Sequence, residues 1–258
     1  MPRVVVAGAG QRGMLCAAKL ARAGAEVTIV EWLPAPGGQE PEPSAGELAE
    51  SAATAGARFV LGTVAIHFGG TFVEVLGGGG ASRLACDALV VATGSRPATT
   101  AELGITGDRC AGVVPWPAAS HLTRAGVLLG HRPLIAGSGE LALRCAREQL
   151  AAGASAVSLT MPADSPSALG AGIRVFPGYR VASVHGTSRV EAAVLRRHRE
   201  SFQVPADALI LAAGMRPMRN IEGAIEPRDG VFFCQPQGEA DAEITASGTA
   251  SLVQATIT

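Results

Sequence analysis

Three glycines near the start of the chain have the spacing of a phosphate-binding turn. Gly8, Gly10 and Gly13 form a G-x-G-x-x-G pattern. In such a turn the first glycine permits a tight bend, the second lets a pyrophosphate approach the backbone, and the third allows a helix to pack closely on a strand. The helix that follows would offer free N–H groups and a positive dipole end to phosphate. The pattern therefore indicates a dinucleotide site.

The segments around this turn are those that a dinucleotide site requires. Val4–Ala7 is a short apolar run, typical of a strand buried on both faces. A helix over 14–22 and a strand over 27–30 are expected next. Glu31 follows that strand, where an acid can accept hydrogen bonds from ribose hydroxyls. The alternative is a chance turn in a chain with 33 glycines, but the context favours the nucleotide site.

The same arrangement recurs in the second half of the chain, as an internal repeat. The apolar run 133–136 leads into G-x-G-x-x-A at 137–142, and a helix over 141–151 and a strand over 156–159 are expected to follow. No acid follows this last strand; Thr160-Met161-Pro162 stands there, without an arginine cluster. The sequence therefore leaves open whether NAD, NADP or another adenine nucleotide binds.

Composition limits the remaining function classes. The 258 residues carry a net charge of −1, which does not favour a nucleic acid or an acidic membrane as partner. The first nine residues lack the basic region of a signal peptide, and no apolar run approaches the ~20 residues that span a bilayer. The five cysteines are scattered and include no C-x-x-C, so no metal site is expected. A reducing, cytoplasmic setting is predicted.

The motifs, taken together, resemble those of the two-dinucleotide-domain flavoproteins of the thioredoxin reductase and pyridine nucleotide-disulfide oxidoreductase superfamily. The stretch 112–142 is most similar to subunits of multi-component amine, opine, proline and cyanide-forming dehydrogenases. The residues that carry the superfamily resemblance are Gly8–Gly13 with Glu31, Gly37-Gly38-Gln39, Ala92-Thr93-Gly94, Gly137–Ala142 and Ala213-Gly214-Met215-Arg216-Pro217.

The resemblance implies an α/β fold with two Rossmann-like domains, each of three β/β/α layers, the second inserted into the first. An FAD domain would comprise 1–115 and 216–258, with a linker at 116–126 and an inserted domain at 127–215. FAD would bind in the first domain, and NAD(P)H or ADP/ATP in the second. The implied cofactor-binding residues are Gly8, Gly10, Gln11, Arg12, Gly13, Glu31, Trp32, Gly38, Gln39, Val64, Ala92, Thr93, Gly94, Gly137, Gly139, Glu140, Gly214, Gly248 and Thr249.

Two departures from the superfamily pattern shape the functional expectation. Because the chain has no C-x-x-C, it is expected not to be a dithiol/disulfide reductase. The superfamily's final Ala-x-Gly-Asp turn is matched to Ala246–Thr249, so that Thr249 replaces the acid, and the helix after it is expected to be nearly absent.

The expected function is an FAD-dependent oxidoreductase, as one subunit of a multi-component dehydrogenase or electron-transfer assembly. The alternative is a non-catalytic nucleotide-binding subunit with a degenerate active site. Its expected partners are other subunits of a redox complex or a second copy of the chain, together with a small-molecule substrate or electron acceptor. No catalytic residue is identified, because the five histidines are isolated from one another in the sequence. A simple NAD(P) dehydrogenase using the first site is less consistent with the repeat.

Overall fold

The computed structural model describes residues 1–38, 44–165, 170–235 and 242–257, and the chain divides into two compact units. Unit 1 comprises Met1–Ser95 and Pro217–Thr258, and unit 2 comprises Arg96–Arg216. The second unit is thus inserted into the first. The chain passes between them at β8 (Ser95–Pro97) and at β18 (Met215–Pro217). None of the helices in the described residues is long and apolar enough to cross a membrane.

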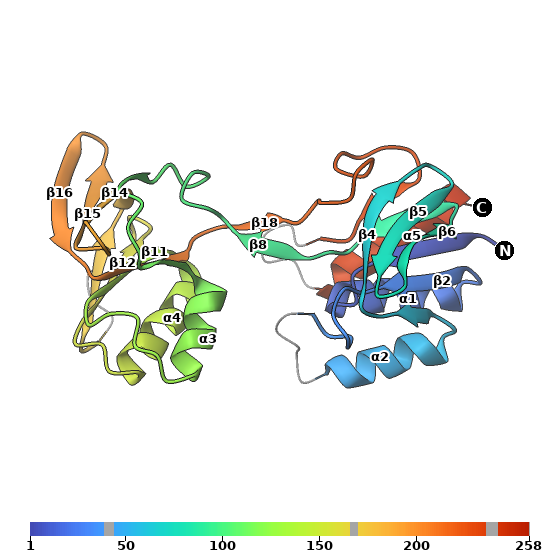
Figure 1. The fold of residues 1–258 in the computed structure, drawn as a ribbon, viewed down its shortest axis with the longest axis horizontal. Helices are drawn as coiled ribbons and strands as arrows, with labels where there is room; N and C mark the ends of the chain where they lie inside the picture. Colours follow the sequence, from blue (N-terminus) through green and yellow to red (C-terminus); the bar gives the residue numbers. More distant parts are fainter. Residues whose placement is uncertain (39–43, 166–169, 236–241, 258) are drawn as a thin grey trace. The chain divides into compact units, whose positions relative to one another are not determined.

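Unit 1 has three layers around a five-stranded parallel sheet in the order β19-β7-β1-β2-β3 (Figure 1). Three helices cover one face of the sheet, and an antiparallel three-stranded sheet covers the other. The strands of the parallel sheet are β1 (Arg3–Ala7), β2 (Glu26–Val30), β3 (Arg58–Val60), β7 (Ala88–Val91) and β19 (Val231–Phe233). The covering elements are α1 (Gln11–Arg22), α2 (Ala45–Thr54), α5 (Ala242–Ile257), β4 (Thr63–Phe68), β5 (Phe72–Gly77) and β6 (Gly80–Ala85).

The alternation of side chains in β1 explains why both faces of this sheet are buried. Val4 and Val6 pack against the helices, whereas Val5 and Ala7 pack against the three-stranded sheet. All four are almost completely inaccessible to solvent, so the expectation of a strand buried on both faces is confirmed. The carboxyl ends of β1, β2 and β7 then lie at one edge, which is where parallel sheets bind ligands.

Unit 2 repeats this architecture around a five-stranded parallel sheet in the order β10-β17-β11-β12-β13. Two helices cover one face, and a four-stranded sheet in the order β16-β15-β14-β9 covers the other. The predicted α/β fold with two Rossmann-like units of three layers is therefore correct. The elements are β9 (Thr106–Gly107), β10 (Val113–Pro115), α3 (Trp116–Arg124), β11 (Pro133–Gly137), α4 (Gly139–Ala151), β12 (Val157–Met161), β13 (Ile173–Pro177), β14 (Arg180–His185), β15 (Ala192–Arg197), β16 (Glu200–Pro205) and β17 (Ala208–Ala212).

The first domain boundary differs from the sequence expectation. The expected FAD domain extended to residue 115 and was followed by a linker at 116–126, but the structure places the crossing after Ser95. β10 pairs with β17 in the sheet of unit 2, and α3 packs against α4. The Gln149 side-chain amide donates a hydrogen bond of 2.8 Å to the Thr123 hydroxyl, which joins these two helices. The expected linker is therefore part of the inserted unit.

The end of the chain also differs from the expectation of a nearly absent helix. Residues 242–257 form α5, a helix of 16 residues that packs against α1. Its buried positions, Ala246, Ala250 and Val253, follow helical spacing, so small apolar side chains allow close approach to α1. The Thr249 hydroxyl donates to the Thr245 carbonyl at 3.0 Å, one turn earlier. Ala246–Thr249 is therefore the middle of a helix and not a turn.

Candidate nucleotide-binding sites

Two of the three glycines in the first turn are required by the packing of the chain itself. Gly8 has a φ of +112°, and a Cβ there would overlap the carbonyl of Ala92 at the end of the neighbouring β7. A Cβ on Gly13 would overlap the carbonyl of Gly8. These contacts hold α1 tightly on β1 and β7, as the third glycine of such a turn is expected to do.

Gly10 differs from both, because the protein leaves space beside it. Its φ is −73°, which any residue adopts, and a Cβ there would meet nothing within 4 Å. Gly10 is also the residue before the first turn of α1, and no side chain caps that helix end. The free N–H groups of the first turn therefore face room that a phosphate could fill. This geometry fits the pyrophosphate of a dinucleotide.

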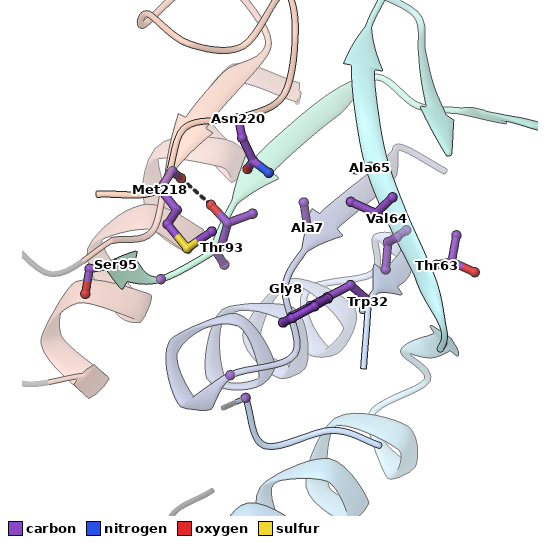
Figure 2. Close-up of a pocket in the computed structure, with 15 residues that line it drawn as sticks. Ala7, Gly8, Trp32, Thr63, Val64, Ala65, Thr93, Ser95, Met218 and Asn220 are labelled. Carbon is purple, nitrogen blue, oxygen red and sulfur yellow. Dashed lines mark hydrogen bonds between the residues drawn. The ribbon is translucent and has the colours of Figure 1, made fainter. Parts of the chain in front are cut away.

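The cavity beside Gly10, called the first cavity here, has a volume of about 360 Å³. This volume is within the range of small-molecule sites, roughly 300–1,000 Å³. Eight residues expected at a cofactor site line it, and Figure 2 shows several of them around one space. The lining residues are Ala7, Gly8, Gly10, Val30, Trp32, Gly38, Thr63, Val64, Ala65, Ala92, Thr93, Gly94, Ser95, Met218 and Asn220.

One end of the first cavity is held by a polar network. The Thr93 hydroxyl donates to the Met218 carbonyl at 2.5 Å, drawn as a dashed line in Figure 2. The buried Gln235 amide donates to the same carbonyl at 2.6 Å and to the Thr93 hydroxyl at 3.2 Å. Arg219 in turn donates to the Gln235 side-chain oxygen at 3.3 Å. Three distant segments are thereby fixed together at the cavity wall.

Sequence reasoning did not identify Met218, Asn220 and Gln235. The superfamily's final turn was matched to Ala246–Thr249, but that stretch lies in α5. The segment that leaves the parallel sheet beside Thr93 and Gly94 is instead Cys234–Gln235, directly after β19. The signal that could have found it is the apolar run 231–233, because the residues that follow a strand of a parallel sheet lie at its ligand-binding edge.

Glu31 has a different environment from the one that its position suggested. The sequence placed it at a strand end facing a crevice, but its side chain is only 3% exposed. Its carboxylate accepts a hydrogen bond from the Ala9 N–H at 2.6 Å and another from the Leu33 N–H at 3.0 Å. Each oxygen keeps a second lone pair, but Glu31 is not among the residues that line the first cavity. Glu31 fixes the glycine turn, and its role toward a ribose stays a prediction.

The other predicted residues of unit 1 that the structure describes do not line the first cavity. Gln11 is exposed on the first turn of α1, and Arg12 and Gly13 follow it without lining the cavity. Gly248 is exposed on α5, and the Thr249 hydroxyl is turned toward the Phe233 and Thr245 carbonyls, so neither is placed to contact a ligand there. Gln39, which was also predicted, lies outside the described part of the chain.

Unit 2 contains a smaller cavity of about 250 Å³ at the carboxyl ends of β11 and β12, called the second cavity here. Of the predicted residues, Gly137 and Gly214 line it. Gly139 begins α4, and Glu140 is exposed and paired with Arg147 at 3.0 Å. The full lining is Leu103, Ile105, Ala136, Gly137, Ser138, Thr160, Met161, Pro162, Tyr179, Arg180, Val181, Ala213 and Gly214.

Comparison with known proteins agrees with this geometry. The family model for pyridine nucleotide-disulphide oxidoreductases matches residues 1–114. The match covers less than half of the chain. No curated protein sequence matches the chain. Among solved structures, a thioredoxin reductase from Lactococcus lactis is 16% identical with a TM-score of 0.67, over 99% of this chain and 98% of that one.

Two other solved structures have the same fold. A pyridine nucleotide-disulfide family oxidoreductase from Enterococcus faecalis V583 is 14% identical with a TM-score of 0.70, over 98% of this chain and 69% of that one. A water-forming NADH oxidase from Lactobacillus brevis, bound to NADH, is 18% identical with a TM-score of 0.65, over 100% of this chain and 69% of that one. At these identities the likeness concerns the fold.

These comparisons contradict the expectation that the chain is not a dithiol/disulfide reductase. The matched structures include thioredoxin reductases, over nearly the whole length of both chains. The absence of a C-x-x-C excludes only cysteines that are close in sequence. The fold brings Cys16, on α1, next to Cys234, after β19, in the core of unit 1. The hydrogen bond between the two thiols and their burial raise the pKa of Cys16.

Proposed function

We propose that the chain is an FAD-dependent oxidoreductase that exchanges electrons with NAD(P)H. FAD would bind in the first cavity, and the nicotinamide dinucleotide in the second. The observation that carries this proposal is Gly10: neither its backbone conformation nor its packing requires a glycine, yet a glycine stands where a pyrophosphate would approach. The matched NADH oxidase, which binds NADH, supports the second part of the proposal.

Different residues along the first cavity would bind different parts of FAD. Gly10 and the first turn of α1 would bind the pyrophosphate, while Thr93 and Met218 would form the wall near the flavin. The hydrogen bonds from Thr93 and Gln235 fix that wall before any ligand arrives. When bound, FAD supplies the redox chemistry by accepting a hydride and passing its electrons on, and the protein orients it and excludes water.

We further propose that the chain works as one component of a multi-component dehydrogenase or electron-transfer assembly. The similarity of residues 112–142 to subunits of such enzymes supports this. The partners would be other subunits of the complex, or a second copy of the chain, and a small molecule would be the substrate or the electron acceptor. Co-purification from the native host, followed by mass spectrometry of the bound chains, tests the proposal; a chain that elutes alone contradicts the assembly.

Two observations motivate the alternative, a non-catalytic nucleotide-binding subunit. The first is the replacement of the superfamily's acid by Thr249, but residues 242–257 form a helix in which the Thr249 hydroxyl donates to backbone carbonyls and does not face the cavity. The other reason, the absence of an acid after β12, remains. ADP or ATP as the ligand of the second unit draws no support from the matched proteins.

One experiment separates these functions. The purified full-length protein is examined for the visible absorption bands of oxidised flavin, with and without added FAD. NADH or NADPH is then added without oxygen. The proposal predicts a bound flavin that is bleached by at least one of the two. A flavin that binds but is never reduced supports the structural subunit instead, and a protein that does not bind FAD refutes the flavin site.

A further inference from the structure

The two units can be compared residue by residue, because their strands pair in the same register. In unit 1, Ala7 precedes the first glycine of its turn and pairs with Val30. In unit 2, Ala136 precedes Gly137 and pairs with Thr160. The residue after Val30 is Glu31, so the equivalent residue in unit 2 is Met161, which follows Thr160.

This substitution changes what the second cavity can recognise. In a dinucleotide site, the acid at this position accepts hydrogen bonds from the ribose hydroxyls of NAD, and such an acid would repel a phosphate on the ribose. Met161 lines the second cavity but offers no charge and only a weak acceptor. Among the described residues that line the cavity there is no aspartate or glutamate.

A cation lines the cavity instead. Arg180, the first residue of β14, shares the cavity wall with Thr160 and Met161. It forms no ion pair with a carboxylate anywhere in the described ranges of the chain. Arg180 was absent from the sequence prediction because it lies about twenty residues after the strand end where an arginine was sought.

The surroundings of Arg180 leave its charge uncompensated. Across the antiparallel ladder it pairs in register with Arg196 on β15, which adds positive charge. Glu200, on the outer strand of the same sheet, accepts hydrogen bonds from Arg197 at 3.0 Å and from the Tyr179 hydroxyl at 2.9 Å. Among the described residues that line the second cavity, the charged side chain is therefore that of Arg180.

We infer that Arg180 binds a phosphate on the 2′ position of the adenosine ribose, so that the second cavity selects NADPH over NADH. The inference depends on the proposed function, in which unit 2 binds a nicotinamide dinucleotide. The cavity lies at the carboxyl ends of β11 and β12, where the adenosine ribose of such a ligand is located. A guanidinium fits phosphate oxygens with two parallel hydrogen bonds.

The test uses fragments that differ by the single phosphate. The full-length protein is titrated calorimetrically with 2′,5′-ADP, with 5′-AMP, and with NADPH and NADH. We expect 2′,5′-ADP to bind at least tenfold more tightly than 5′-AMP, and NADPH to exceed NADH by a similar factor. Arg180→Ala should weaken 2′,5′-ADP roughly tenfold to a hundredfold, as for a lost charge-assisted pair, and leave 5′-AMP unchanged.

Two further variants make the test specific. Arg132→Ala removes an arginine just before β11, at the amino end of the parallel sheet and away from the cavity, so it should change the preference by less than about threefold. Met161→Glu should reverse the preference, because a carboxylate would repel the phosphate and accept the ribose hydroxyls.

The outcomes are distinguishable from a failure of the proposed function. Equal affinity for 2′,5′-ADP and 5′-AMP, or an equal loss of both in Arg180→Ala, overturns the role of Arg180 while nucleotide binding itself stands. If none of the four ligands binds, the inference falls together with the nicotinamide part of the proposed function. The flavin absorption of the same preparation reports separately on the first cavity.

Discussion

The contrast between Gly8 and Gly10 yields the sharpest prediction. Gly10→Ala introduces a methyl group where the protein has open space and an ordinary backbone conformation. The unfolded chain loses freedom, which stabilises the fold by about 0.4–1 kcal/mol, and alanine is a poorer residue than glycine before a helix by a similar amount. The net change in the free energy of unfolding should be within about 1 kcal/mol, and Tm should move by no more than about 2–4 °C.

The same methyl group should impair FAD binding. It would stand between the pyrophosphate and the free N–H groups of the first turn of α1, and one charge-assisted hydrogen bond is worth about 1.5–3 kcal/mol. We therefore expect Kd for FAD to rise roughly tenfold to a hundredfold in a calorimetric titration.

Gly8→Ala is the matched control, because it makes the same substitution at a position where packing and backbone conformation require glycine. The new Cβ would overlap the Ala92 carbonyl and require a φ of +112° from a residue with a side chain. Backbone strain of about 1–3 kcal/mol and overpacking of about 1–3 kcal/mol add to a loss of roughly 2–6 kcal/mol. If calorimetric unfolding shows Gly10→Ala to be as destabilised as Gly8→Ala, or if Gly10→Ala binds FAD like the parent, the assignment of Gly10 to the ligand is wrong.

Three other substitutions or treatments test the described contacts. Glu31→Gln should lower the free energy of unfolding by about 1–3 kcal/mol, since an amide N–H would face the Ala9 or the Leu33 N–H; an unchanged urea midpoint would count against the role of Glu31 in fixing the turn. Gln235→Glu should destabilise more than Gln235→Leu in the same assay, because a carboxylate would face the carbonyls of Met218 and Gly94; the reverse order would show that the network is assigned wrongly. A thiol reagent at about pH 8 should modify Cys110 in the folded protein before Cys86 and Cys145, because burial raises the pKa of Cys86 to about 11 and of Cys145 to about 12 and keeps both thiols protonated; mass spectrometry that finds Cys145 modified first would contradict this.

The sequence predicted the elements whose pattern reflects burial. β1 and α1 were found because an apolar strand, a glycine turn and a helical spacing of small residues follow one another. β6 and β16 were not predicted as strands, since most of their side chains are exposed and lack an apolar alternation. They are held by backbone ladders to β5 and β15, and β6 also by the Arg83–Glu74 pair at 2.6 Å. Pairing with a neighbour leaves no pattern within the strand itself.

The residues of the candidate site also include some that the sequence predicts and some that it does not. The residues of the glycine turn could be predicted because their spacing is local, whereas Gln235 and Met218 reach Thr93 only through the return of the chain from unit 2. Neither carries a motif, since an amide side chain and a backbone carbonyl are common throughout a protein. Arg180 was missed for a related reason, because β14 reaches the second cavity by folding over the sheet.

The two glycine turns have similar sequence motifs but do not support nucleotide binding equally. Gly139 is the counterpart of Gly10, but its φ is +73°, so the backbone itself favours glycine at that position whether or not a ligand is bound. Gly10 has no such requirement, and its glycine is explained by a ligand. The motif is therefore strong support for a nucleotide in unit 1 and weaker support in unit 2. In unit 2 the case depends on the side chains of the cavity, Met161 and Arg180 above all, which is why the titrations with and without the 2′-phosphate decide it.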